Sequence, residues 1–123
     1  MANKKHVLIV DDSRLTRMIF SKVIVSHFGD WDITQAEDAT SALELCKKNN
    51  FDFISLDHNM PDATGLEILP SLQTLQPNAH IGVFTANVQQ VLQDRFSALG
   101  AICYNKPVDE AKILQFINAG ELA

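Results

Sequence analysis

Two short runs that each end in aspartate constrain the fold of this chain more than any other sequence feature. The run at residues 6–10 leads into Asp11 and Asp12, and the run at residues 53–56 leads into Asp57. Both are almost continuously apolar, which is typical of strands buried on both faces of a parallel sheet. If these strands are neighbours, three carboxylates meet at one edge, and unit charges about 4 Å apart repel by about 4 kcal/mol at an effective dielectric constant near 20. We therefore expect a cation, or a carboxyl group with a raised pKa, at this edge.

Strand-like and helix-like patterns alternate along the whole chain. The predicted strands are residues 6–11, 31–36, 51–57, 80–85 and 101–105. The predicted helices are residues 13–27, 39–49, 65–75, 88–99 and 109–119. This alternation indicates a doubly wound α/β fold, a five-stranded parallel sheet with five helices on its two faces. A ligand of such a sheet binds outside the carboxyl ends of the strands, where the aspartates are predicted to lie.

Local signals mark the ends of the helices. Asp12 or Ser13 is expected to cap the first helix, and Gly100 is expected to follow the end of the fourth. Pro70 lies inside the third predicted helix and removes a backbone donor there, so we expect it to bend or shorten that helix. Residues 59–65 are predicted to form a loop because they contain Pro, Asp and Gly.

The composition is typical of a single globular domain over residues 1–123. The chain has 46% hydrophobic and 20% charged residues and a net charge of −5. Without a basic stripe, direct DNA binding is not expected. No apolar run reaches the roughly 18–20 residues that span a bilayer. We expect a cytoplasmic protein in which Cys46 and Cys103, which lack metal-motif spacing, are reduced thiols.

Polar residues at the predicted strand ends suit phosphoryl chemistry. An acidic pair and a single aspartate suit Mg²⁺, for which Mn²⁺ could substitute. Thr85 closes the fourth strand, and its hydroxyl can donate to a phosphoryl oxygen. Lys106 follows the fifth strand and supplies a compact positive charge. A carboxylate nucleophile, a metal ion, a lysine and a hydroxyl group together indicate phosphoryl transfer to an aspartate.

From Lys5 to about Gly120 the sequence resembles the receiver domains of two-component response regulators, especially the single-domain chemotaxis type. That family has a flavodoxin-like fold with strand order 2-1-3-4-5. No single motif is decisive, but all four occur in order, each at a predicted strand end. They are Val10-Asp11-Asp12-Ser13, Leu56-Asp57-His58-Asn59-Met60-Pro61 with Gly65 eight residues after the Asp, Thr85-Ala86, and Lys106-Pro107.

The resemblance implies how the acidic edge would work. Asp57 would accept a phosphoryl group from a histidine kinase or a phosphotransfer protein in a Mg²⁺-dependent reaction. Asp12 would bind the ion directly, and Asp11 largely through water. Asn59 would bind it through its backbone carbonyl. Lys106 would pair with Asp57 at rest and with the phosphoryl group afterwards, and its bond to the following proline is expected to be cis.

The resemblance also implies a switch. Thr85 would move toward the phosphoryl oxygen, together with an aromatic residue that receivers place three positions before the lysine. Here that position is Cys103. Counted from Gly100 instead, the matching residue is Tyr104, which we prefer because a cysteine has no ring to rotate.

Two asparagines are expected to tune the lifetime of the phosphorylated state. Asn59 and Asn87 lie two residues beyond Asp57 and Thr85, where their side chains would control the approach of water. His58 is expected to point away from the acceptor. His6, His27 and His80 are interpreted as surface or hydrogen-bonded residues.

Two other functions remain open on the sequence alone. An aspartate-nucleophile phosphohydrolase would need a second aspartate two residues after the nucleophile, where this chain has Asn59 after Asp57 and Ser13 after Asp11. An adaptor that works without phosphate would not need the whole polar set. We expect no enzyme activity beyond self-phosphorylation and slow self-dephosphorylation. The signal is expected to pass by protein–protein contact from a monomer or weak dimer.

Overall fold

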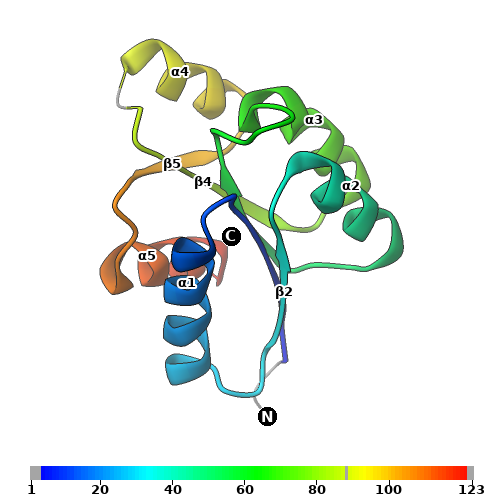
Figure 1. Ribbon diagram of the computed structural model, residues 1–123, viewed down its shortest axis with the longest axis vertical. Helices are drawn as coiled ribbons and strands as arrows, with labels where there is room; N and C mark the ends of the chain where they lie inside the picture. Colours follow the sequence, from blue (N-terminus) through cyan, green and yellow to red (C-terminus); the bar gives the residue numbers. More distant parts are fainter. Residues whose placement is uncertain (1–3, 88, 122–123) are drawn as a thin grey trace.

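Strands and helices alternate along the chain in the computed structural model, which describes residues 4–87 and 89–121 (Figure 1). The strands are β1 (His6–Val10), β2 (Asp32–Ala36), β3 (Phe53–Asp57), β4 (His80–Thr85) and β5 (Ile102–Asn105). The helices are α1 (Arg14–His27), α2 (Ala39–Lys48), α3 (Gly65–Leu75), α4 (Gln90–Ala98) and α5 (Glu110–Glu121).

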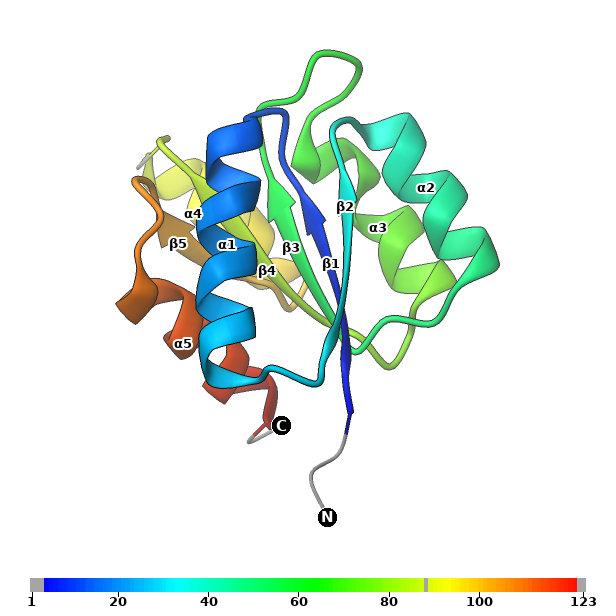
Figure 2. The same ribbon diagram turned by 60° about the horizontal axis from the view of Figure 1, so that its bottom comes forward.

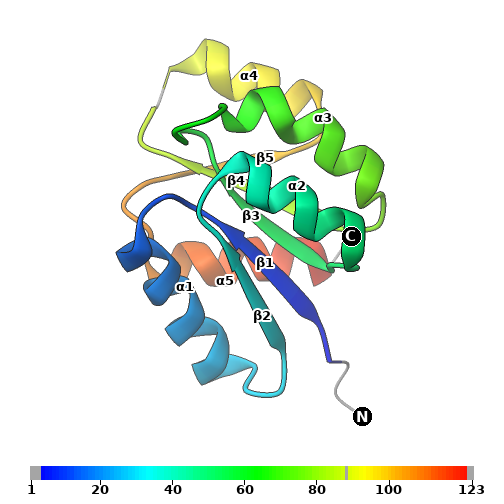
Figure 3. The ribbon, with the colours of Figure 1, turned by 45° about the vertical axis from the view of Figure 1, so that its right-hand side comes forward.

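The five strands form one parallel sheet in the order β2-β1-β3-β4-β5. Helices α1 and α5 cover one face, and α2, α3 and α4 cover the other (Figures 2 and 3). The chain reverses its direction of winding between β1 and β3, which are neighbours in the middle of the sheet. The predicted fold class is confirmed, and the switch point lies where the two aspartate-terminated runs end.

Each face of the sheet buries its own core. The face under α2, α3 and α4 is mainly aliphatic, whereas the face under α1 and α5 contains most of the large aromatic side chains. Phe20 and Phe84 meet edge to face there, with ring centroids 4.9 Å apart. Every residue of β3 is buried, as the almost continuously apolar run predicts. The two central strands therefore hold the aspartates that follow them on a rigid base.

The helix ends follow local chemistry with three differences from prediction. Ser13 caps α1 by accepting a hydrogen bond from the Thr16 amide at 3.3 Å, and Gly100 has the positive φ of 82° typical of the position after a helix. Pro70 does not shorten α3, which begins and ends where predicted. The first turn of α3 is stabilised by a capping box between Thr64 and Glu67. Pro70, which has no backbone amide hydrogen, lies after this stabilised turn.

The other two differences concern α4 and α5. The predicted start of α4, Val88, lies outside the described residues, and the helix begins at Gln90. Helix α5 runs through Gly120 to Glu121, two residues beyond the predicted end at residue 119. A side chain at Gly120 would collide with the rings of Phe53 and His80, so this glycine serves close packing rather than helix termination.

The histidines divide into two groups. His6 Nε2 lies 2.7 Å from Thr34 Oγ1, and His27 Nε2 lies 3.3 Å from Glu110 Oε2, as expected of hydrogen-bonded residues. His80, which is hydrogen-bonded with the Phe116 backbone, departs from this interpretation at one ring nitrogen. Its ring stacks on Phe116, and its buried Nε2 has no hydrogen-bond partner among the described residues.

None of the helices in the described part of the chain is both long enough and apolar enough to cross a lipid bilayer.

Candidate functional site

Three aspartates converge at the carboxyl ends of β1 and β3. The register pairs Val10 with Leu56, so the residues that follow them, Asp11 and Asp57, lie side by side. One carboxylate oxygen from each of Asp11, Asp12 and Asp57 lies within 4.8 Å of the others. Asp11 and Asp57 are buried, whereas Asp12 is exposed. The predicted acidic edge is present in the structure.

Lys106 brings a positive charge to this cluster from the end of β5. Its Nζ lies 2.9 Å from Asp11 Oδ2 and 3.2 Å from Asp57 Oδ1. The sequence predicted the contact with Asp57 but not the shorter one with Asp11. The Lys106 amide donates to the Thr85 carbonyl at 3.0 Å, and the Lys106–Pro107 bond is cis, as expected. Lys106 therefore shares a single positive charge between two buried carboxylates.

The cluster remains short of positive charge in spite of Lys106. Burial, followed by the charge of Asp11, raises the pKa of Asp57 to about 6, although Lys106 and the Asn59 amide act to lower it. Burial alone would lower the pKa of Lys106, but its hydrogen bonds and charge interactions with Asp11 and Asp57 raise it. Lys106 is therefore firmly protonated, while Asp57 ionises with difficulty.

This donor set fits a hard divalent cation. Three carboxylate oxygens within 4.8 Å of one another supply the oxygen ligands that Mg²⁺ prefers, and the exposed Asp12 opens the cluster to solvent. A second positive charge would also relieve the repulsion that raises the pKa of Asp57. Asp11, Asp12 and Asp57 could therefore hold such an ion.

The loop after β3 leaves Asp57 in a fixed geometry. The Asn59 amide donates to Asp57 Oδ1 at 3.2 Å, and the Gly65 amide donates to the His58 carbonyl at 2.8 Å. A Cβ atom at Gly65 would lie 2.9 Å from the Asp57 carbonyl oxygen, so only glycine allows this close approach. Asn59 also forms an isolated antiparallel bridge with Thr64 across the base of the loop.

Thr85 and Asn87 lie at the end of the neighbouring strand. Thr85 is buried, and its Oγ1 accepts a hydrogen bond from the Asn87 amide at 3.1 Å. The Asn87 side chain in turn accepts from the Gln89 amide at 3.0 Å. Because the Asn87 contact uses only an acceptor position of Thr85, the hydroxyl hydrogen is not consumed by it.

The preference for Tyr104 as the aromatic that moves with Thr85 is wrong in its geometry. Tyr104 stacks on Phe84, with ring centroids 4.9 Å apart, on the face covered by α1 and α5. Cys103 pairs with Val83 and packs with the core on the opposite face. Side chains alternate along a strand, so Thr85 shares the face of Cys103 rather than that of Tyr104.

His58 points toward helices rather than toward the acceptor, as predicted. Its ring meets Phe96 of α4 edge to face at 5.5 Å, and its Nδ1 lies 3.4 Å from the Leu66 amide. Burial lowers the pKa of His58. The side chain therefore packs between the β3–α3 loop and α4.

Two contacts that hold the loops of the site are not predicted from the sequence. The Arg17 guanidinium donates to the Asp11 carbonyl at 2.5 Å and to Gln35 Oε1 at 3.0 Å. Asp62 accepts hydrogen bonds from the start of α2. Spacing within the sequence gives no signal for either contact, because each joins segments that only the folded topology brings together.

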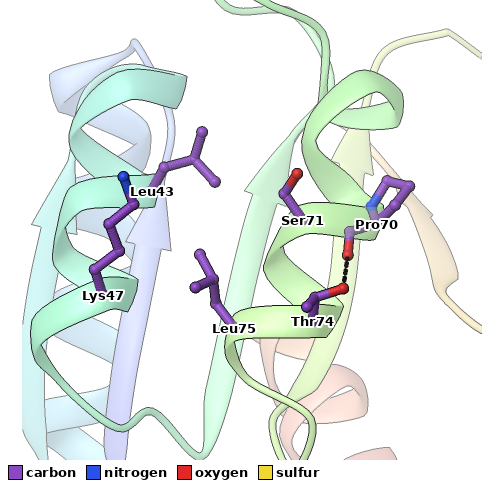
Figure 4. Close-up of a pocket in the computed structure, with 6 residues that line it drawn as sticks. All are labelled: Leu43, Lys47, Pro70, Ser71, Thr74 and Leu75. Atoms are coloured by element: carbon purple, nitrogen blue, oxygen red, sulfur yellow. Dashed lines mark hydrogen bonds between the residues drawn. The ribbon is translucent and has the colours of Figure 1, made fainter.

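A hollow of about 490 Å³ lies away from the acidic edge, between α2 and α3 (Figure 4). Its walls contain none of the predicted site residues. Leu43 and Leu75 point into it from opposite helices, beside Lys47. Nothing in its lining resembles a catalytic or metal-binding set, so the candidate site is the acidic edge.

Sequence comparison connects the chain to known proteins. Residues 7–118 match the response regulator receiver domain family. Over 75 residues, 61% of this chain, the sequence is 41% identical to the protein-glutamate methylesterase/protein-glutamine glutaminase of Escherichia coli (strain K12). The match covers 22% of that protein, so the chain spans only a small part of this relative's length.

Solved structures of similar proteins share the whole fold. The response regulator of Burkholderia pseudomallei with a phosphorylated aspartic acid and a calcium ion has a TM-score of 0.84 at 26% identity, covering 97% of this chain and 71% of that one. CheY in the CheX-CheY-BeF3-Mg complex of Borrelia burgdorferi has 0.85 at 29% identity, covering 94% and 87%. Chemotaxis response regulator CheY4 of Vibrio cholerae has 0.84 at 26% identity, covering 96% and 99%.

Proposed function

The chain belongs to the response regulator receiver domain family, whose members are phosphorylatable signalling switches, and we propose that Asp57 is its phosphoacceptor. The donor would be a histidine kinase or a phosphotransfer protein. The observation that carries this assignment is the position of Asp57, buried between Lys106 and the other two aspartates. Among the three carboxylates, Asp57 is the one that ends the central strand and contacts the lysine while facing the acidic cluster.

The proposed reaction is the transfer of a phosphoryl group to the Asp57 side chain. A carboxylate oxygen forms a bond to phosphorus as the phosphorus–nitrogen bond of the donor's phosphohistidine breaks, and the leaving imidazole takes up a proton. A bound Mg²⁺, which Mn²⁺ could replace, supplies positive charge to the carboxylates and the phosphoryl oxygens. Asp11, Asp12, Asp57 and the Asn59 carbonyl would hold it.

The remaining residues stabilise and report the product. Lys106 can transfer its hydrogen bond from Asp57 to a phosphoryl oxygen while keeping its contact with Asp11. Thr85 retains a hydroxyl hydrogen that it can donate to another phosphoryl oxygen. Movement of Thr85 toward that oxygen would shift the conformational equilibrium of the β4–α4 segment. Cys103 lies on the same face and would adjust with it. Asn59 and Asn87 would control the approach of water.

The signal would leave the domain by protein–protein contact rather than by catalysis. A phosphohydrolase is not favoured, since Asn59 stands where such an enzyme needs a general acid. The Borrelia CheY is found in a complex with CheX, which shows the kind of partner that a similar protein binds. We propose a partner protein of that general kind, bound in the cytoplasm by a monomer or weak dimer without DNA.

Incubation with Mg²⁺ and a small-molecule phosphodonor such as acetyl phosphate tests the proposal. We expect one base-labile phosphoryl group, located on Asp57 by mass spectrometry, and none when EDTA is present. Asp57→Ala serves as the matched control and should remain unmodified. Equal labelling of that variant would overturn the assignment of Asp57. An absence of labelling in a protein that still binds a partner would favour a phosphate-independent adaptor.

A further inference from the structure

The tip of the loop between β3 and α3 is tied to a helix that precedes it in the sequence. Asp62, at this tip, accepts hydrogen bonds from the Ala39 amide at 3.0 Å, the Thr40 amide at 2.9 Å and the Thr40 hydroxyl at 2.7 Å. All three donors belong to the first turn of α2. The Thr40 hydroxyl, followed by the two amides, lowers the pKa of Asp62 to about 2, so the carboxylate stays charged across the physiological range.

Helix α2 has its own cap and gains a second one from Asp62. Asp38 is the N-cap residue, and its side chain accepts from the Ser41 amide at 2.8 Å. The first amides of a helix have no partner within the helix, and Asp62 satisfies those that Asp38 leaves. Because α2 already begins with a good cap, the tie has its larger consequence for the loop.

The loop is held at its base as well as at its tip. At the base, the Gly65 amide bonds the His58 carbonyl at 2.8 Å, and Asn59 bridges to Thr64. The Asn59 carbonyl, which belongs to the proposed metal site, lies at this base, three residues before Asp62. Fixing a residue's backbone in one conformation costs entropy, so a loop that is already fixed loses less when it binds an ion.

We propose that Asp62 is a positioning residue for the divalent metal ion. By tying the loop to α2, it holds the Asn59 carbonyl ready before the ion arrives. The inference rests on the proposed function, since it needs a metal site at the acidic edge. Asp62, an exposed residue outside that cluster, would therefore contribute to the affinity of the site for the ion. By reciprocity, the ion should also stabilise the hydrogen bonds at the start of α2.

A comparison of two cap variants tests this inference. Asp62→Ala removes the tie, whereas Asp38→Ala removes the other cap of the same helix and leaves the loop untouched. We expect Asp62→Ala to weaken Mg²⁺ binding by about three- to tenfold in calorimetric titration. We expect Asp38→Ala to lower the melting temperature at least as much while Mg²⁺ affinity stays within about twofold of wild type. Equal affinities for wild type and Asp62→Ala, or an equal loss in both variants, would overturn the inference.

Amide hydrogen exchange gives a second readout that a purely structural cap would not move. In the wild type, saturating Mg²⁺ should slow exchange at the Ala39 and Thr40 amides. In Asp62→Ala this effect of the ion should disappear, and an unchanged effect would contradict the coupling. If Asp62→Ala does not fold, Thr40→Val, which removes only the hydroxyl contact, should show a smaller loss of affinity in the same direction.

Wild-type titration separates this inference from the proposed function. If the wild type binds no Mg²⁺, the proposed metal site fails, and the role of Asp62 fails with it. If the wild type binds Mg²⁺ and is phosphorylated on Asp57, while Asp62→Ala matches it in affinity, only the role of Asp62 fails.

Discussion

The two ends of the sheet treat buried polar groups in opposite ways. At the carboxyl end, Asp11 and Asp57 are buried together, and Lys106 is in contact with both. At the amino end, the half-buried His80 ring packs against Phe53 and Phe116, and its buried Nε2 has no partner among the described residues. The first arrangement gathers charge that only a cation can balance, whereas the second avoids charge by keeping a ring neutral.

The difference indicates which end has a function beyond folding. A cluster of like charges destabilises the fold, so removing the acceptor carboxylate should raise stability while it abolishes phosphorylation, whereas removing the lysine should lower both. A neutral buried histidine contributes to packing, so substitutions at the amino end should change stability alone. Four predictions test this contrast, beginning with the largest expected effect.

Lys106→Met should be the most damaging change at the carboxyl end. It leaves two buried carboxylates without their cation, which we expect to lower the free energy of unfolding by about 3 kcal/mol in the presence of EDTA. Urea unfolding measures this loss, and added Mg²⁺ should recover part of it. Phosphorylation of Asp57 should slow by at least about tenfold. Lys22→Met, on the exposed side of α1, is the control; equal stability of both variants would contradict the role of Lys106.

Asp57→Asn should abolish phosphorylation and yet stabilise the metal-free protein. The substitution removes a buried charge whose pKa is raised by burial and by Asp11, while Lys106 keeps its shorter contact with Asp11. We expect a gain of about 1–2 kcal/mol in urea unfolding with EDTA present. Added Mg²⁺ should stabilise the wild type more than the variant. A metal-free variant less stable than wild type would show that Asp57 is not under electrostatic strain.

Asn59→Ala and Asn87→Ala should change the lifetime of the phosphorylated state far more than the fold. A smaller side chain beside the acyl phosphate admits water more readily, so we expect dephosphorylation to accelerate by about three- to tenfold, which corresponds to roughly 1 kcal/mol. The decay of the phosphorylated protein after removal of the donor measures the rate. Asn78→Ala, at the other end of the sheet, is the matched control. Decay curves that coincide with wild type for both variants would refute the assignment.

His80→Phe should have the smallest effect and should show it only in acid. Burial lowers the pKa of His80 below its ordinary value of 6.5, so the unfolded chain takes up a proton that the folded chain refuses. The contribution of the neutral His80 ring to stability is therefore fully present above pH 6.5 and is lost as the pH falls below that value. Between pH 7.5 and pH 5.5, the free energy of unfolding should fall less in the variant than in wild type, by up to about 1 kcal/mol. Urea unfolding at both pH values measures this difference. Parallel losses in both proteins would contradict a neutral buried ring.

The sequence predicts the architecture and the acidic edge because both depend on short-range patterns. A run such as Phe53–Asp57 is apolar almost throughout, so its burial and its polar end are visible without a structure. Parallel strands then bring their carboxyl ends to one edge by topology alone. The meeting of Asp11 and Asp57 follows from these two facts, whereas the contact of Lys106 with Asp11 does not.

The missed features depend on register and on contacts between distant segments. Tyr104 and Cys103 exchange faces if the last strand shifts by one residue, and counting from either end of that strand gives a different answer. Gly120 resembles a helix terminator until the rings of Phe53 and His80 are seen beneath it. The contact of Asp62 with α2 joins positions 23 residues apart along the chain.

The shared contacts of Lys106 also define the electrical balance of the acidic edge. Three carboxylates and one ammonium group leave two net negative charges, which a single divalent cation would balance. With a divalent cation bound and Asp57 unphosphorylated, the acidic edge would therefore have no net charge. Phosphorylation of Asp57 would then add negative charge that nothing within the cluster cancels, and neighbouring segments that carry hydrogen-bond donors would approach to compensate.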